Sequence, residues 1–503
     1  MKRNIIKYLP LLLILIAGST SCKKSFLDVN PTSSADDAAI FTTTNNAKNV
    51  INGAYRYLFN RFNTQNMPGH GGVMLNNDFM GEDLHQANAS WYTSGANGTG
   101  NWNTHKLDNS AWVEYPFRLY YRVIGNMNSI IANVDNAAGP DADKALLKGE
   151  AYGMRAWSYF NLVQYYAKRY DASAKPNSSP GVSMPLLPTD VSLPRSTVEE
   201  VYAQINADID ASIAEFNKAG TINQNKSHFS LIAAKVLKAR LALTMQDYPT
   251  TIQFANEVLT SGKFSLMSID QYKAGFNDAP SNPEWIWAAL IISDQGDTFG
   301  SYFGQISWNG NTSYIRGIPK RINKELYDRI PSTDVRKTLW EPSPNATNFP
   351  LPLSTFARSP YMSRKFKTRA NDNTLGDVPY MRLAEVYLML AEAHARTAGG
   401  TANAQQALFD FVSKRDPAYV KSTNTGEALI NEIMDNRRTE LWGEGFRFFD
   451  LKRLNQPLDR TVVSNFVPAS VNGTMQIPAG DVKWQWAIPI FEIQANPNTV
   501  QNP

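Results

Sequence analysis

The sequence predicts an all-α fold in which helix hairpins form a scaffold that is interrupted by long irregular stretches with minor β-structure. Two observations predict this fold. Apolar residues recur at helical spacing in two blocks, residues 142–262 and 378–455. Two long stretches, residues 60–115 and 263–377, have little helical spacing and are rich in Gly, Asn, Pro and aromatic residues. Stretches of this length are too long to be plain connectors.

The first block contains two clear helix signals. Ala156 and Phe160 lie on an apolar stripe within residues 142–170, which predicts a buried amphipathic helix. Ser196 and Thr197 each precede a glutamate by three residues, and this spacing predicts a capping box at a helix start. We therefore expect a second helix to begin directly after these two residues.

The remaining helices are predicted as antiparallel pairs. Leu237 and Leu241 line a third helix, after which Tyr248 and Pro249 turn the chain into a fourth that ends near Gly262. The second block repeats this arrangement, with helices expected around residues 383–393, 404–412, 427–441 and 445–454. The hairpins have small residues at their crossings and spacings near the roughly 34-residue tetratricopeptide period. They predict a tetratricopeptide-like α-solenoid.

The second stretch also contains a strand signal. Residues Glu284 to Ile292 form an apolar run that reads as a buried strand. Trp285 and Trp287 lie within it, so we expect both indole rings to belong to the core.

The first 21 residues have the layout of a bacterial signal peptide. Three basic residues precede an apolar run from Leu9 to Ala17, and small residues then lead to Cys22, the only cysteine of the chain. The apolar run is shorter than the ~20 residues that a membrane-spanning helix needs. We therefore expect residues 1–21 to be removed and Cys22 to carry the lipid of a lipoprotein. Ser19 stands where such signals usually have leucine.

The charge of the mature chain is nearly balanced. The whole sequence has 49 basic and 45 acidic residues, and removal of residues 1–21 leaves 46 against 45. Nucleic-acid binding normally requires a clear basic excess, so a nucleic-acid partner is not expected. The five histidines show no paired ligand spacing, and we expect neither a metal site nor a cofactor.

Several segments, spread nearly from end to end, resemble the SusD/RagB family of outer-membrane nutrient-binding lipoproteins. The segments that carry the resemblance are Ser25–Pro31, Gly53–Tyr55, Arg155–Val163, Met184–Leu186, Arg195 with Val201–Ile209, Arg382–Ala393, Arg437–Arg453, and the tail from Ile488 to Pro503. In the tail, Phe491 stands where a proline is usual.

The resemblance implies both a fold and a function. The fold is a single domain over residues 22–503, in which tetratricopeptide-like hairpins carry insertions that form a ligand face. The function is that of a lid on a TonB-dependent (SusC-like) outer-membrane transporter. Such a lid captures glycans or other large nutrients at the cell surface, is held by its lipid anchor alone, and catalyses nothing.

A cluster of charged residues in the second block invites a catalytic interpretation. Its spacing instead places the groups on one helix face and the following turn, where ion pairs join helices. We expect a structural ion-pair network formed by Arg382, Glu385, Glu392, Arg437, Arg438, Glu440, Glu444, Arg447 and Asp450.

Sugar binding needs a flat apolar surface for a pyranose ring, with hydrogen-bonding groups around it. Aromatic side chains near Asn and Asp supply both. Candidates in the first stretch are Asp78, Trp91, Tyr92, Asn97, Asn101 and Trp102, and candidates in the second are Trp308, Asn309 and Tyr314. Burial in the loop cores is the alternative for each ring.

Three other functions compete with glycan capture. An all-α glycoside hydrolase or lyase would need two opposed carboxylates roughly 5 to 10 Å apart. A tetratricopeptide scaffold that binds only proteins would leave the aromatic insertions unused. A periplasmic-type solute-binding fold would need alternating strands and helices, which the sequence lacks.

Overall fold

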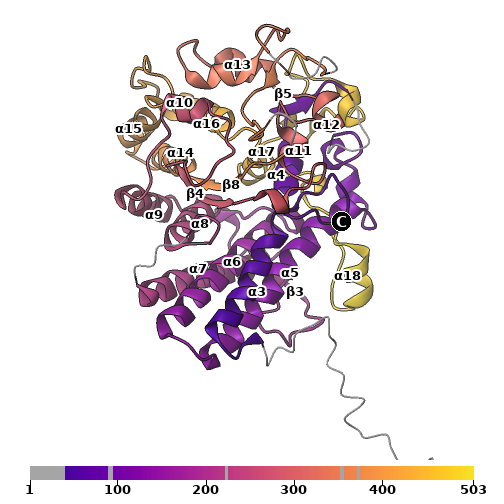
Figure 1. Cartoon of the computed structure of the whole chain (residues 1–503), viewed down its shortest axis with the longest axis vertical. Helices are drawn as coiled ribbons and strands as arrows, with labels where there is room; N and C mark the ends of the chain where they lie inside the picture. Colours follow the sequence, from indigo (N-terminus) through magenta and orange to yellow (C-terminus); the bar gives the residue numbers. More distant parts are fainter. Residues whose placement is uncertain (1–39, 89–94, 221–224, 350, 352–355, 371–373) are drawn as a thin grey trace, which may run out of the picture.

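Helices stacked side by side form most of the molecule (Figure 1). This computed structural model describes residues 40–88, 95–220, 225–349, 351, 356–370 and 374–503. The helices of the body are α3 (Thr44–Tyr57), α5 (Ala111–Asn133), α6 (Asp141–Tyr166), α7 (Val198–Ala219), α8 (Leu231–Thr244), α9 (Tyr248–Thr260), α14 (Leu383–Ala395), α15 (Thr401–Val412), α16 (Gly426–Glu440) and α17 (Arg447–Arg453). The predicted all-α fold with minor β-structure is confirmed.

Local sequence signals set several helix starts. Thr197 is the N-cap of α7 and forms a complete capping box with Glu200, so the structure selects Thr197 over Ser196. Asp247 caps α9, and Pro249 lies in its first turn, where a missing N–H is harmless. Helices α5 to α9 pack in chain order, as do α14, α15 and α16, and α14 packs against α8 and α9 although about 120 residues separate them. The helical body is thus continuous across the insertion.

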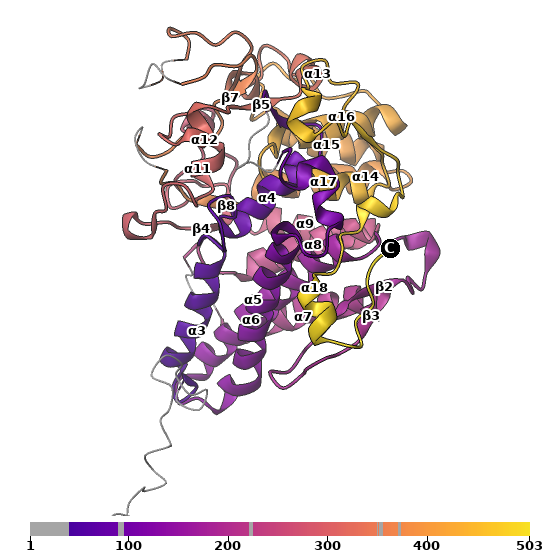
Figure 2. The ribbon, with the colours of Figure 1, turned by 90° about the vertical axis from the view of Figure 1, so that its right-hand side faces the viewer.

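The segment between α9 and α14 folds as an insertion on one side of the body (Figure 2). Its helices are short: α10 (Ile269–Lys273), α11 (Phe303–Ile306), α12 (Ser313–Arg316) and α13 (Lys324–Arg329). Its strands are β4 (Trp285–Ala289), β5 (Lys320–Ile322), β6 (Trp340–Glu341), β7 (Met362–Ser363) and β8 (Val378–Arg382). Strand β1 (Leu84–Gln86) joins β5, β7 and β6 in an antiparallel four-stranded sheet. The sheet therefore connects the two predicted insertions.

The first stretch contains more helix than its sequence indicates. Helix α4 (Gly69–Phe79) lies within residues 60–115, where we expected little helical structure, and α5 begins at Ala111. Every residue of α4 is buried. A helix that is enclosed on all sides has no polar face and shows no amphipathic stripe. Its three glycines obscured the signal further.

An aromatic cluster forms the centre of the core. Trp157 of α6 lies edge-on to Trp287 of β4, with ring centroids 5.1 Å apart, and Trp287 lies 5.0 Å from Tyr380 of β8. His70 of α4 and Tyr120 of α5 share a hydrogen bond of 2.8 Å. Burial lowers the pKa of His70 to about 3, with a smaller contribution from Arg240. Trp285 and Trp287 are fully buried, as predicted. The cluster joins the insertion to the helical body.

Two small strand pairs and a final helix complete the fold. Strands β2 (Pro180–Ser183) and β3 (Arg195–Thr197) pair before α7, and β9 (Leu458–Asp459) pairs with β10 (Gln476–Ile477). Helix α18 (Ile490–Ala495) packs against α5, where Phe491 lies edge-on to Phe117, and it lies below the insertion in Figure 2. Among the described helices, none has the length and apolarity that crossing a bilayer requires.

Candidate functional site: the insertion face and a lateral cavity

The charged residues of the second block form several separate buried clusters. In the first, Arg382 contacts Glu284, Glu440 and Glu444, with the Glu444 contact at 2.7 Å. Arg415 and Lys365 complete this cluster, at 2.7 Å from Glu284 and 2.6 Å from Glu444 respectively. Burial would raise the pKa of the Glu440 carboxyl, but the surrounding arginines lower it well below its usual range. Glu440 is therefore ionised, and all three carboxylates of the cluster are engaged in ion pairs.

The other charged residues pair in the same manner. Asp450 contacts Arg437 at 2.7 Å and Arg453 at 2.8 Å, and Arg453 also contacts Glu392. The remaining pairs join Arg438 to Glu82 and Asp83, Arg447 to Glu82, and Glu385 to Arg240. All nine residues that we expected in a structural network thus take part in ion pairs.

Asp78 is enclosed in the protein. Its carboxylate accepts hydrogen bonds from the backbone N–H groups of Gly445 at 3.0 Å and Arg447 at 3.2 Å. Burial raises the pKa of Asp78 to about 7, and these two hydrogen bonds oppose the rise. The residue is only 3% exposed, so it cannot serve as a ligand contact or as an acid for a glycan at the surface. The structure corrects our expectation for this residue.

Four more of the expected ligand residues are buried, which overturns their assignment to an open face. Trp102 is fully enclosed, and its indole N–H donates to the Met80 carbonyl at 2.8 Å. Asn101 organises its own loop by donating to the Ala96 carbonyl at 2.7 Å. Asn309 accepts from the Thr368 backbone N–H at 2.8 Å, and the buried Tyr314 hydroxyl donates to Gln65. Their polar atoms stabilise loops from within.

The other expected residues have different positions. Trp91 and Tyr92 lie outside the described residues. Asn97 is exposed in the first insertion, where its carbonyl accepts from the Trp112 indole at 3.0 Å. Trp308, between α11 and α12, is half-buried. Trp308 is therefore the described candidate that offers part of an aromatic surface to solvent.

The surroundings of Trp308 hold its ring in place. The Trp308 backbone N–H donates to the Phe366 carbonyl at 3.0 Å, and its ring lies edge-on to Phe349 at 5.1 Å. The guanidinium of Arg364 lies 4.8 Å from the centre of the Phe349 ring and is paired with Glu341. We call Trp308, Phe349 and Arg364 the Trp308 platform. It combines an aromatic surface with charged groups, as recognition of a sugar ring requires.

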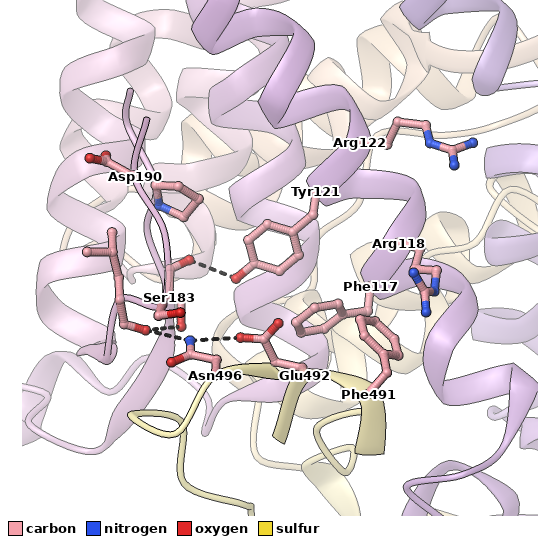
Figure 3. Close-up of a pocket in the computed structure, with 12 residues that line it drawn as sticks. Phe117, Arg118, Tyr121, Arg122, Ser183, Asp190, Phe491, Glu492 and Asn496 are labelled. Atoms are coloured by element: carbon pink, nitrogen blue, oxygen red, sulfur yellow. Dashed lines mark hydrogen bonds between the residues drawn. The ribbon is translucent and has the colours of Figure 1, made fainter. Parts of the chain in front are cut away.

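A cavity of about 350 Å³ lies on another side of the molecule (Figure 3). Phe117 and Tyr121 of α5 form one wall and Phe491 of α18 forms another, with the Arg118 guanidinium 3.6 Å from the Phe491 ring centre. The polar groups at its edge are largely engaged. Tyr121 donates to the Ser183 carbonyl at 2.7 Å, and the Asn496 amide donates to Glu492 and to the Leu193 carbonyl.

Our sequence interpretation missed this cavity. The one signal for it was Phe491, which replaces the proline usual in the SusD/RagB tail and supplies the aromatic wall.

A second cavity, of about 470 Å³, lies between residues 168–179 and 480–485 and is more polar. Across the described ranges, no three His, Cys, Asp or Glu side chains gather as a metal site would require.

Comparison with known proteins gives consistent matches. Residues 300–503 match the family model described as "SusD family", and residues 25–243 match the one described as "Starch-binding associating with outer membrane". A SusD-like protein of Formosa agariphila is 22% identical over an alignment 520 residues long, which covers 93% of each chain.

Solved structures share the fold. A SusD-like carbohydrate binding protein from Bacteroides vulgatus superposes with a TM-score of 0.76 at 24% identity, covering 91% of this chain and 98% of its own. A SusD superfamily protein from Bacteroides thetaiotaomicron gives 0.76 at 24% identity, with 92% and 100% covered. A laminarin binding SusD-like protein gives 0.70 at 19% identity, also with 92% and 100% covered.

Proposed function

The chain belongs to the SusD/RagB family, and from this premise we propose that it is a glycan-binding lipoprotein of the outer membrane. In this proposal it acts as the lid of a TonB-dependent, SusC-like transporter and delivers captured glycan for import. The family description "associating with outer membrane" and the solved relatives named for carbohydrate binding support it.

The observation that carries the proposal is the half-buried Trp308 on the insertion. A pyranose ring stacks its C–H face on an aromatic side chain, and such stacking contributes affinity when the ring is held rigidly. Phe349 and the backbone hydrogen bond to Phe366 hold Trp308 in this way. Trp91, in the first insertion, remains a proposed partner for the same glycan.

The buried carboxylates support a binding role over hydrolysis. A glycosidase needs two carboxyl groups that face the substrate, one of them protonated near neutral pH. Among the described acids, Glu440, Glu444 and Asp450 are buried, paired with arginines and have lowered pKa values. Asp78 has a raised pKa but is enclosed. A hydrolase or lyase remains the alternative that the experiment must test.

The first experiment is affinity electrophoresis of the chain from Lys23 onward, which contains the whole described structure, against a polysaccharide panel. We expect retardation by at least one polysaccharide with no release of reducing ends. Trp308→Ala should weaken the retardation about tenfold, which is the loss expected from one stacked ring. Release of reducing ends would favour the hydrolase, and absence of binding would overturn the proposal.

The cavity in Figure 3 provides a matched control. Phe491→Ala removes an aromatic ring from a cavity that is lined by α5, α18 and residues 183–193 and does not include the insertion. We expect this variant to bind as well as the parent. If Phe491→Ala weakens binding and Trp308→Ala does not, the glycan binds in the cavity and the Trp308 platform is not the site.

Anchoring and partnership need a separate test in the native membrane. We expect the full chain to sediment with outer membranes and to co-purify with a TonB-dependent transporter. Cys22→Ser should release it into the soluble fraction, because each buried CH₂ of the acyl chains contributes about 0.8 kcal/mol to membrane binding. Membrane retention of this variant would contradict lipidation at Cys22.

A further inference from the structure

Positive charge is concentrated in one part of the chain. Residues 301–377 contain 12 Lys and Arg against 6 Asp and Glu, whereas the rest of the chain after residue 21 contains 34 against 39. The segment that carries the Trp308 platform is therefore basic, and the remainder of the mature chain is slightly acidic. Charge separated in this way produces a local positive potential that attracts anions.

Some of these basic residues are neutralised by neighbouring carboxylates. Arg364 pairs with Glu341, Lys365 with Glu444, Arg369 with Asp377, Lys324 with Asp328, Arg329 with Asp435, and Arg336 with Asp334. Half of the cations in the segment are therefore neutralised in ion pairs within the protein. The other six cations have no ion pair among the described residues. Three of them, Lys320, Arg321 and Lys337, donate to backbone carbonyls instead. The remaining three are Arg316, Arg358 and the exposed Lys367.

Arg316 and Arg358 lie on adjacent stretches of chain. Arg316 is the last residue of α12, and its carbonyl accepts from the Ala357 backbone N–H at 2.6 Å. Both side chains are half-buried. The Nε atom of each guanidinium is shielded from solvent and has no hydrogen-bond partner within the part of the chain that the structure describes.

A buried guanidinium N–H without a partner is unfavourable, because the group has lost water and gained no acceptor. A ligand does not reach these two Nε atoms, but each side chain is only half-buried and so also extends to the surface, where an anion can bind it. Guanidinium groups present a planar set of donors that matches the oxygens of a carboxylate or sulfate. A neutral sugar hydroxyl satisfies the same donors less strongly.

Lys320, four residues after Arg316, is a further cation of this segment. Its ammonium group is buried and donates to the carbonyls of Tyr314 at 3.3 Å and Ile318 at 2.9 Å. Burial lowers the pKa of Lys320 to about 7, so the group is partly charged at neutral pH.

Resting on the proposed glycan-binding function, we propose that the chain selects anionic glycans. Arg316 and Arg358 bind carboxylate or sulfate groups of the glycan, on the same insertion as the Trp308 platform. The charge imbalance of residues 301–377 favours an anionic ligand, and so does the position of two half-buried arginines that have no ion pair among the described residues.

The test compares matched pairs of polysaccharides that differ only in charge. The chain from Lys23 onward is run in affinity electrophoresis and in titration calorimetry against polygalacturonate and its carboxyl-reduced form, and against λ-carrageenan and its desulfated form. Starch and laminarin serve as neutral references. We expect binding to at least one charged member, at least tenfold weaker binding to its neutral counterpart, and weakening with added salt.

Variants distinguish a defined site from general attraction. Arg316→Gln with Arg358→Gln should weaken binding to the charged polysaccharide at least tenfold. Arg329→Gln removes one unit of charge, as each single change of the double variant does, from an exposed residue of the same segment and should have little effect. Arg316→Lys keeps the charge but not the planar donors, so an intermediate loss is expected. Unchanged circular dichroism and melting temperature establish that each variant is folded.

The outcomes separate this inference from the proposed function. Equal or tighter binding to the neutral member of each pair would overturn the inference and leave the proposed glycan-binding function standing. Equal losses in the Arg329→Gln and the double variant would also overturn it, because general electrostatic attraction would then explain the binding. Failure to bind any member of the panel would overturn the proposed function itself.

Discussion

At the scale of single residues, arginine partners decide the charge of the buried acids. Burial alone would raise the pKa of Asp450, but Arg437 and Arg453 lower it to about 2. The folded pKa is thus below the unfolded value of about 3.9. The stability that these pairs contribute is therefore present above about pH 4 and is lost as the pH falls toward 2.

We expect Asp450→Asn to lower the free energy of unfolding at pH 7 by about 3 kcal/mol, because it leaves two buried guanidinium groups without their shared carboxylate. Urea unfolding at pH 7, 5 and 3 measures the effect. The difference from the parent should shrink below about pH 4, because the carboxyl of the unfolded parent then takes up a proton while the folded one stays ionised down to about pH 2. A difference that stays constant at all three values would contradict this account.

Asp328→Asn is the matched control for this series. Asp328 also pairs with a cation, Lys324, but both side chains are exposed and lie one turn apart on α13. Surface pairs of this kind contribute little. The control should unfold like the parent at each pH.

Trp102 and Trp308 show how far single residues could be predicted. Both lie among Gly and Asn in irregular stretches, so the sequence assigned both to a ligand face. Their burial depends on distant residues. Trp102 is enclosed by contacts with Met80 and Trp484. Within the described chain, the one aromatic ring that contacts the Trp308 ring is that of Phe349. Such contacts across long sequence separations leave no local pattern.

At the scale of elements, local signals located most of the helices correctly. Helix α7 was predicted from its capping box and apolar period, both of which are properties of neighbouring residues. Helix α4 was missed because its environment, not its sequence, keeps it helical: it is buried on every side. The fold class could be predicted because most of the helices have one polar and one apolar face, which leaves an apolar stripe in the sequence.

The capping box of α7 provides a test at this scale. We expect Thr197→Ala to destabilise the protein by about 1 kcal/mol, because the Glu200 backbone N–H loses its side-chain acceptor. Ser196→Ala is the comparison, since the adjacent serine is not the cap. Chemical denaturation of both variants measures the difference. Equal losses in the two variants would show that the capping box does not stabilise α7.

At the scale of the whole molecule, residues from the two ends of the chain are joined in the interior. Asp83 contacts Arg438 at 2.6 Å, and its carbonyl accepts from the Trp442 indole at 2.8 Å. The Asn77 amide donates to the Gly445 carbonyl at 3.0 Å. About 360 residues separate these partners, so the first insertion cannot detach without exposing buried charges.

This connection predicts coupled unfolding. We expect Asp83→Ala and Arg438→Ala to be non-additive, with a coupling energy of about 1–3 kcal/mol in a double-mutant cycle. We also expect circular dichroism and tryptophan fluorescence of the parent to report one thermal transition. Two separated transitions, or additive losses, would indicate that the two ends of the chain unfold independently.

The burial of the tryptophans has an optical consequence. Of the ten described tryptophans, nine are buried and Trp308 alone is half-buried. In a Trp91→Phe background, a water-soluble quencher such as iodide should therefore extinguish one small, red-shifted fraction of the emission and spare the rest. A sugar ring that covers Trp308 would shield that fraction and shift it to shorter wavelength. The protein thus contains its own spectroscopic reporter of ligand occupancy.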